Sequence, residues 1–318
     1  MATEKENPNL EKFLRDQEQS AAAQRGDVRE DEELVGRHKV DSLDDSEGYR
    51  SLDMSCAPMS VFYEPGALIE IRAATTGEIQ DYSTVDDNNL YDITMKMNAV
   101  LAKCSRLRRP DGSVASYREI KEGDRLFIIT EISRLTTSSG NRLQHEVSCP
   151  SESCDCVNHI EVSSKSFVLL KPDPTIVSRF FDEEARVFNF KIKALADDPF
   201  TLGAPTIGVA QDLYAYMVDR MTKKLKMNVA FMKIIPWMLH DRTSISVKGA
   251  EELEFRFTKW HKDKFLAVNA AIGKMAFGIE ELEKRCEKCG VEVRTPFTFP
   301  GGYSALFIVS NAFEDLIG

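Results

Sequence analysis

Alternating apolar and polar positions begin near residue 59 and predict where the folded part of the chain starts. In the stretch MSVFYEPGALIEIRAAT, residues 68–72 alternate in the way that a half-buried strand requires. Residues 142–149, 159–170 and 186–195 continue this alternation. The first two of these segments flank a group of cysteines, so we expect them to form the arms of a hairpin.

Helical spacing of apolar residues follows in other segments. In residues 88–104, Ile93, Met97 and Val100 recur at near-helical intervals after good capping residue types. Residues 116–136 lead toward a second helix, and 206–225 and 250–285 predict a helical C-terminal third. Pro236 should break or kink any helix that contains it. We therefore expect an α+β fold, in which a small mixed β/α domain with a zinc-ribbon-like knuckle precedes a helical C-terminal region.

The negative charge is concentrated at the N-terminal end. Residues 1–60 hold 15 Asp or Glu and 8 Lys or Arg, so they supply −7 of the formal charge of −10. Few aromatic or β-branched residues occur there, which is typical of a solvated arm. We expect three parts: an acidic arm at 1–56 that is disordered or loosely helical, an α+β domain at 57–200 with the first cysteine group, and a helical region at 201–318 with the second group and an apolar tail.

The apolar tail and a methionine-rich tract are the segments whose burial the pattern leaves open. Residues 295–318 must either cap the core of the protein or dock on a partner. The tract with Met217, Met221, Met227, Met232 and Met238 is either core packing or an adaptable partner surface.

The chain after the acidic arm is close to neutral, so no charge pattern indicates that it binds nucleic acid. No run approaches the ~20 apolar residues of a membrane span.

Five of the seven cysteines fall in two short clusters: Cys149, Cys154 and Cys156 in VSCPSESCDCVNHIEV, and Cys286 and Cys289 in KRCEKCGVEVRTPF. The C-x-x-C-G turn of the second cluster resembles half of a tetrahedral thiolate site. Zinc needs four ligands, and neither cluster provides four cysteines. The simplest interpretation is one structural Zn(II) shared by both clusters.

For this metal site we take Cys286 and Cys289 as the firmest ligands. Two of Cys149, Cys154 and Cys156 complete the set, and our assignment is Cys149 and Cys154. Replacement of one of these ligands by Cys156 or His159 stays open. The alternative is two redox-inert or disulfide-forming pairs, which the opening MATEKENPNLEKF disfavours, because it has no apolar signal-peptide core and implies a reducing cytosol.

The usual signatures of catalysis are missing from the sequence. It contains no P-loop, no G-x-G-x-x-G after a strand, no H-E-x-x-H and no G-x-S-x-G. Cys56 and Cys104 are better explained as packed or incidental thiols than as nucleophiles. A thiolate-rich zinc site has its coordination filled by protein. We therefore expect neither an enzyme nor a small-molecule substrate.

Several blocks of the sequence resemble a known family. Residues 62–84, 88–104 and 116–136, together with CEKCGVEVRTPFTF at 286–299 and the aromatic segment at 304–317, are similar to the T4-type bacteriophage baseplate proteins. This family contains the baseplate hub assembly subunits of contractile-tailed phages. The resemblance covers residues 57–318. The acidic arm has no counterpart in it, and the residues inserted in CPSESC loosen the first cysteine cluster.

The resemblance implies a morphogenesis factor, either a chaperone-like assembly protein or a hub subunit, whose partners are phage baseplate hub proteins. It places the protein in the host cytoplasm or in the tail baseplate of the virion, and it implies no covalent reaction. The competing interpretation is a zinc-ribbon protein of transcription or nucleic-acid processing, since C-x-x-C knuckles are common there. The near-neutral charge of residues 57–318 speaks against that alternative.

Overall fold

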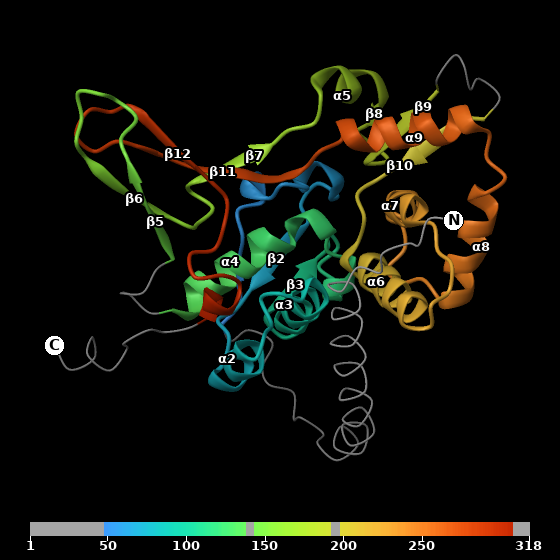
Figure 1. Cartoon of the computed structure of the whole chain (residues 1–318), viewed down its shortest axis with the longest axis horizontal. Coiled ribbons are helices and arrows are strands. Elements are labelled where there is room, and N and C mark those ends of the chain that lie inside the picture. Colours follow the sequence, from blue (N-terminus) through green and yellow to red (C-terminus); the bar gives the residue numbers. More distant parts are fainter. Residues whose placement is uncertain (1–47, 138–142, 192–197, 308–318) are drawn as a thin grey trace, which may run out of the picture. The chain divides into compact units, whose positions relative to one another are not determined.

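The computed structural model describes residues 48–137, 143–191 and 198–307. Within these ranges the chain forms eight α-helices and four small antiparallel sheets (Figure 1). The chain divides into two compact units, Gly48–Tyr214 with Asn228–Gly318, and Met1–Glu47 with Ala215–Met227. Of the second unit, only Ala215–Met227 belongs to the described residues. It comprises the end of one helix and a turn that the Arg220 guanidinium closes on the Lys226 carbonyl at 2.7 Å.

The first sheet has the strand order β1 (Arg50–Ser51), β2 (Leu68–Ile71), β3 (Ser105–Arg108) and β4 (Val114–Ala115). Its centre confirms the alternation expected at residues 68–72. Ile69 and Ile71 are buried, whereas Glu70 turns to the other face and pairs with Arg106 at 2.6 Å and Arg108 at 2.9 Å. Both arginines come from β3, so the ion pairs hold the two central strands in register.

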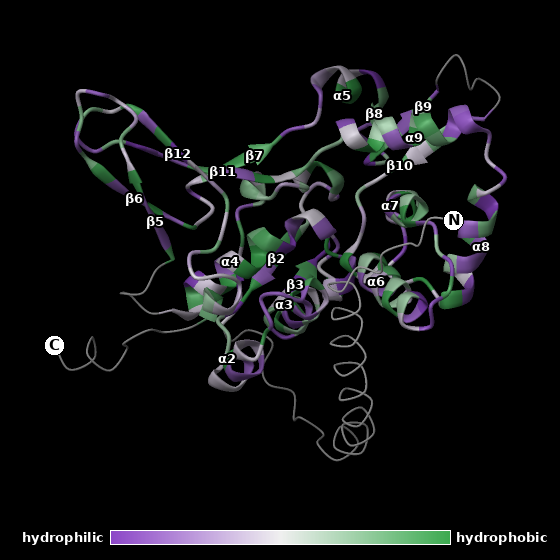
Figure 2. Cartoon of the chain, in the orientation of Figure 1, coloured by the Kyte–Doolittle hydropathy of each residue, from purple (hydrophilic) through white to green (hydrophobic). Residues whose placement is uncertain are grey.

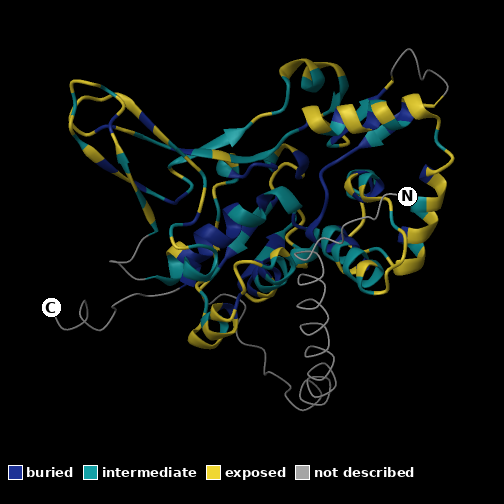
Figure 3. Cartoon of the chain, in the orientation of Figure 1, coloured by how far each residue is buried: buried dark blue, intermediate teal, exposed yellow. Residues whose placement is uncertain are grey.

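Helices α3 (Leu90–Cys104) and α4 (Arg125–Thr136) contact this sheet, and α2 (Thr76–Ser83) contacts α3. The helix expected at 88–104 is confirmed, and Asn89 caps it by accepting from the N–H groups of Tyr91 and Asp92. The segment expected to lead to a second helix first makes two short 3-10 turns and becomes α-helical only at Arg125. Figure 3 shows α4 mostly buried, in agreement with its run of buried residues from Phe127 to Ser133.

The later helices are α5 (Pro174–Phe180), α6 (Ile207–Thr222), α7 (Val229–Met238), α8 (Val247–Phe257) and α9 (Lys262–Lys274). In Figure 2, α8 and α9 carry both hydrophobic and hydrophilic positions, as amphipathic helices do. The expected α+β class is confirmed, but the helices are not confined to the C-terminal region, because α2, α3 and α4 precede it. Pro236 lies inside α7, which ends two residues later.

The helical pattern expected up to residue 285 is wrong for its last part. Residues 278–285 form the strand β11 (Gly278–Arg285), which pairs with β7 (Phe167–Leu170) on one side and β12 (Glu292–Pro296) on the other. Pairing on both edges outweighs the helix-favouring Glu, Leu and Lys of this segment. The remaining sheets are β5 (Gln144–Ser148) with β6 (Val157–Glu161), and β8 (Phe181–Asp182), β9 (Val187–Phe190) and β10 (Phe200–Leu202).

As far as residue 307 the apolar tail packs on the core of the protein. Of the two alternatives for the tail, capping the core therefore holds for residues 295–307. Phe299, Leu306 and Phe307 are buried. The ring of Phe307 lies 4.9 Å from that of Tyr82, edge to face, and the Tyr82 hydroxyl donates to the Tyr303 carbonyl at 3.1 Å. Residues 308–318 and the acidic arm at 1–47 lie outside the described residues. Residues 48–56, expected in the arm, contain β1 and a 3-10 turn at Met54–Cys56.

Candidate metal centre

The two cysteine clusters lie at the turns of two β-hairpins. The turn between β5 and β6 contains Cys149, Cys154 and Cys156, and the turn between β11 and β12 contains Cys286 and Cys289. The hairpins lie side by side, because β12 contacts β5 and β11 contacts β6 (Figure 1). Clusters that are far apart in the sequence are thereby brought together, as the shared-site hypothesis requires.

Four sulfur atoms form the centre of this arrangement. The Sγ atoms of Cys149, Cys154, Cys286 and Cys289 all lie within 4.8 Å of one another. The Cys149–Cys289 sulfurs are 3.4 Å apart and the Cys154–Cys286 sulfurs 3.8 Å. A tetrahedral zinc with Zn–S bonds of ~2.3 Å separates its sulfurs by about 3.8 Å, whereas a disulfide needs ~2.05 Å. The spacing therefore fits four thiolates around one metal such as zinc.

Backbone N–H groups point at these sulfurs, as in thiolate knuckles. In the second turn, the N–H of Cys289 lowers the pKa of Cys286 to about 6, assisted by the N–H of Lys288. Gly290 closes this turn with a φ of 75°, in the left-handed region, and its N–H donates to the Cys286 carbonyl at 2.9 Å. The turn thus favours a thiolate at Cys286 before any metal is bound.

In the first turn, the pKa values of the cysteine ligands are raised rather than lowered. The N–H of Ser151 lowers the pKa of Cys149, but desolvation and hydrogen bonds with the other three thiols outweigh it and raise that pKa to about 12. The pKa of Cys154 is also raised, against the effect of the Cys156 N–H. The cluster therefore shares protons among its sulfurs, and metal binding would have to displace them.

Cys156 and His159, the alternative ligands, lie outside the four-cysteine cluster. The Cys156 thiol faces the Val157 carbonyl at 3.6 Å and the Asn158 Oδ1 at 3.9 Å. His159 is exposed, and its Nδ1 lies 3.8 Å from the Glu146 carboxylate. The other histidine near this region, His145, approaches the Thr298 carbonyl at 3.0 Å. The geometry thus supports the assignment of Cys149 and Cys154 rather than Cys156.

Asn158 is a residue of this centre that the sequence analysis missed. It is buried between the hairpins and accepts the N–H of Glu287, in the opposite turn, at 3.4 Å. The sequence could have pointed to Asn158, because it is a polar residue at an inward-facing position of an alternating strand, directly after a cysteine cluster. Two ion pairs flank the turns, Lys288–Asp155 at 2.5 Å and Lys284–Glu287 at 2.6 Å. Both are largely exposed, so they contribute little energy.

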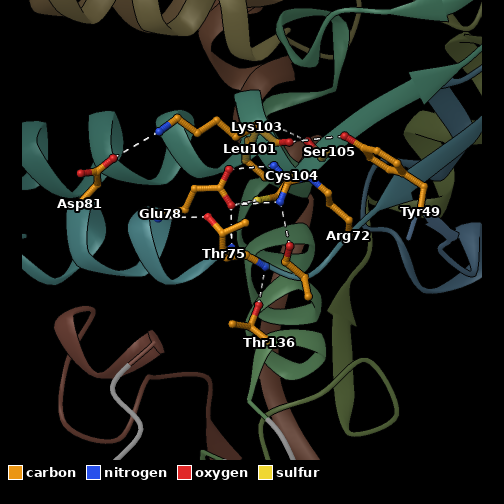
Figure 4. Close-up of polar contacts among 12 residues, drawn as sticks. Tyr49, Arg72, Thr75, Glu78, Asp81, Leu101, Lys103, Cys104, Ser105 and Thr136 are labelled. Atoms are coloured by element: carbon orange, nitrogen blue, oxygen red, sulfur yellow. Dashed lines mark hydrogen bonds and ion pairs between the residues drawn. The ribbon is translucent and has the colours of Figure 1, made fainter. Parts of the chain in front are cut away.

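Cys104, the other candidate thiol, lies in a separate polar cluster at the end of α3 (Figure 4). Its sulfur is 3.4 Å from Oε2 of Glu78, which Arg72 binds through both terminal nitrogens at 2.7 and 3.0 Å. The hydrogen bonds from Arg72 lower the pKa of Glu78 to about 2. Burial raises the pKa of Cys104 to about 12, so this thiol is protonated at neutral pH and is poorly suited to nucleophilic attack.

Glu78 has a structural task in this cluster. It forms a capping box with Thr75 at the start of α2, and its Oε2 accepts the Thr75 N–H at 2.8 Å. The adjacent N–H of Ala74 donates to the Thr136 hydroxyl at the end of α4, at 2.8 Å. The cluster therefore fastens the β2–α2 connection to α3 and α4, as the sticks in Figure 4 show.

An apolar cavity of about 520 Å³ lies between β7, α5 and the segment around residues 55–61. Phe181, Phe188 and Phe277 contribute aromatic walls, and Lys171 is the charged residue of the lining. The residues that line it include no histidine, carboxylate or cysteine. The cavity is therefore lined mainly by apolar and aromatic side chains.

No helix in the described ranges is both long enough and apolar enough to cross a membrane. Comparisons of this chain with protein-family models, with curated proteins and with solved structures found no match. Function is therefore inferred from the four-cysteine centre and from the sequence pattern.

Proposed function

We propose that this protein is a bacteriophage baseplate hub assembly factor or hub subunit, which acts through protein–protein contacts and carries one structural Zn(II). The observation that carries the metal is the cluster of four cysteine sulfurs within 4.8 Å of one another. The hub assignment rests on the sequence blocks that resemble T4-type baseplate proteins.

The residues of the centre suit a structural metal. Cys149, Cys154, Cys286 and Cys289 would hold the ion, and four thiolates leave it no open position for water or substrate. When bound, the metal supplies a crosslink between the two hairpins. The chain itself supplies the knuckle N–H groups that favour thiolates and the strand pairs that hold each turn. The centre therefore supports a stabilising role rather than hydrolysis.

The blocks that resemble the phage family are dispersed in the sequence but adjacent in the fold. Residues 62–84 contain β2 and α2, residues 88–104 contain α3, and residues 116–136 contain α4. Helix α3 contacts both α2 and α4, and the 3-10 turn Ser304–Phe307 contacts α2 and α4. This joint packing supports one shared structural unit behind the resemblance.

A zinc-ribbon protein that binds nucleic acid remains the second candidate, because paired hairpins with cysteines at both turns are the architecture of zinc ribbons. The charges near the turns speak against it. Glu152, Asp155 and Glu287 balance Lys284, Arg285 and Lys288, so the tips carry no net positive charge for phosphates. Contacts with protein partners are therefore the better-supported function.

Two measurements test the proposal separately. Purified protein should contain one zinc per chain, and Cys286→Ser should lose it, whereas unchanged zinc content in that variant would contradict the shared site. For the hub assignment, tagged protein should retain baseplate hub proteins from a phage-infected host. A sharply salt-dependent affinity for DNA or RNA, without retention of hub proteins, would favour the nucleic-acid candidate instead.

A further inference from the structure

Asn158 connects the two cysteine-bearing turns through one buried side chain. It is the second residue of β6, pairs with Val147 of β5, and is 2% exposed. Its Oδ1 accepts the backbone N–H of Glu287 at 3.4 Å. Glu287 lies between the two cysteines of the opposite turn, so Asn158 contacts the second knuckle from within the first hairpin.

The amide nitrogen of Asn158 has a different environment. Nδ2 is buried and has no hydrogen-bond partner within the described part of the chain. Buried donors are nearly always paired, so this orphan indicates an acceptor that is completed by a bound group. The Asn158 Oδ1 is bound to the N–H of Glu287, the residue that directly follows Cys286, so the amide group lies at the Cys286 side of the second knuckle. The unpartnered Nδ2–H is therefore placed next to the knuckle that carries Cys286.

We propose that Asn158 is a positioning residue of the metal centre, which donates an Nδ2–H···S hydrogen bond to the metal-bound thiolate of Cys286 while its Oδ1 holds the Glu287 backbone. This inference rests on the metal-binding part of the proposed function. Four thiolates around one divalent ion leave excess negative charge on sulfur, and hydrogen bonds from surrounding groups compensate such charge and orient the ligands. The Asn158 amide is a neutral donor that burial holds in place. It can therefore compensate the charge on sulfur without a charged group that would compete with the metal.

The variants Asn158→Leu and Asn158→Asp test the donor role of the amide, the first without and the second with an acceptor for the Glu287 N–H. Leucine removes both polar atoms at similar volume, and aspartate keeps an acceptor for the Glu287 N–H but has no donor for sulfur. We expect both to weaken zinc binding by about 10- to 100-fold in competition with a chromophoric chelator. The matched control is Asn98→Leu on α3, since Asn98 is 1% exposed and pairs with Gln211. Its zinc affinity should stay within about twofold of the unaltered protein.

A spectroscopic measurement separates positioning from general loss of structure. With Co(II) in place of zinc, loss of an N–H···S bond should shift the thiolate-to-cobalt charge-transfer band to longer wavelength in both Asn158 variants and leave it in place in Asn98→Leu. Zinc affinity and a band equal to those of the unaltered protein in Asn158→Leu would overturn the inference. Should Cys286→Ser retain metal at full affinity, the metal centre itself would be wrong, which is a distinct outcome.

A measurement on the unaltered protein covers variants that fail to fold. With ¹¹³Cd bound, hydrogen bonds to the coordinating sulfurs transmit scalar coupling from the metal to the donated proton. We expect this coupling at the Asn158 side-chain amide as well as at the Cys289 N–H. Coupling at Cys289 without coupling at Asn158 would overturn the proposed hydrogen bond.

Discussion

Gly208 lies in the first turn of α6. Helix propensity alone predicts that alanine at this position stabilises the protein, whereas the surrounding structure predicts that it destabilises it. A Cβ at this position would lie 1.9 Å from the Thr243 carbonyl oxygen and 2.9 Å from the Arg118 Cβ. The neighbouring backbone is held in place, because the Thr206 hydroxyl donates to the Arg242 carbonyl at 2.7 Å and Arg118 Nε to the Thr243 carbonyl at 3.2 Å. Gly208→Ala must therefore displace a fixed segment.

The magnitude follows from three contributions. Alanine gains about 1 kcal/mol in helix propensity. Overpacking against backbone costs about 1–3 kcal/mol, and weakening the two hydrogen bonds costs about 1 kcal/mol each. We expect Gly208→Ala to lower the free energy of unfolding by about 2–4 kcal/mol.

Urea unfolding followed by circular dichroism, with zinc in excess, measures this change. The matched control is Gly273→Ala in α9, where a Cβ would meet no atom within 4 Å. That variant should be more stable by about 0.5–1 kcal/mol. A Gly208→Ala protein as stable as the unaltered one, or shifts of the same sign in both variants, would refute the reasoning.

Three further predictions concern the metal, a buried carboxyl and the tail. Chelation should lower the thermal midpoint strongly, and Cys289→Ser should abolish zinc binding while Cys156→Ser keeps one zinc per chain; zinc loss in Cys156→Ser would reverse the ligand assignment. Burial raises the pKa of Asp124 from 3.8 to about 7, so the folded protein keeps a proton that the unfolded chain loses. The resulting stability is present below pH 3.8 and is lost as the pH rises through about 7. Between pH 4.5 and 6.5 this contributes a fall of about 1.4 kcal/mol per pH unit, which the difference between the unaltered protein and Asp124→Asn should reveal; equal slopes in denaturant titrations would contradict it. Phe307→Ala should lower the free energy of unfolding by about 3–5 kcal/mol, and a loss below about 1 kcal/mol would show that this ring is not core.

Local pattern was sufficient for the elements whose shape depends on their own residues. The spacing of Ile93, Met97 and Val100 predicted α3, since one apolar face is enough to specify a helix on a core. The cysteine spacing predicted that the two clusters meet, because two turns with two ligands each can complete one tetrahedral site, but it left open which two of Cys149, Cys154 and Cys156 take part. Helix α2 was overlooked although its capping box, Thr75 with Glu78, is visible in the sequence.

Strand β11 could not be predicted in the same way. Its residues GIEELEKR favour a helix, and its strand conformation comes from partners more than 100 residues away in β7 and from the turn that follows it. The same holds for Asn158, whose importance appears only once Glu287 is placed against it. A local sequence pattern therefore contains no information about such long-range pairing.

The separation of the cysteine ligands along the chain has a consequence for synthesis. Cys149 and Cys289 are 140 residues apart, which a ribosome at ~5–20 residues per second takes about 7–28 s to translate. During that interval the nascent β5–β6 hairpin has emerged with three thiols and no second turn to complete the tetrahedron. Early capture of those thiols by another metal or an oxidant would compete with correct assembly. Translation products that stop before Cys286 can never finish the centre, so quality control should remove them faster than the full chain.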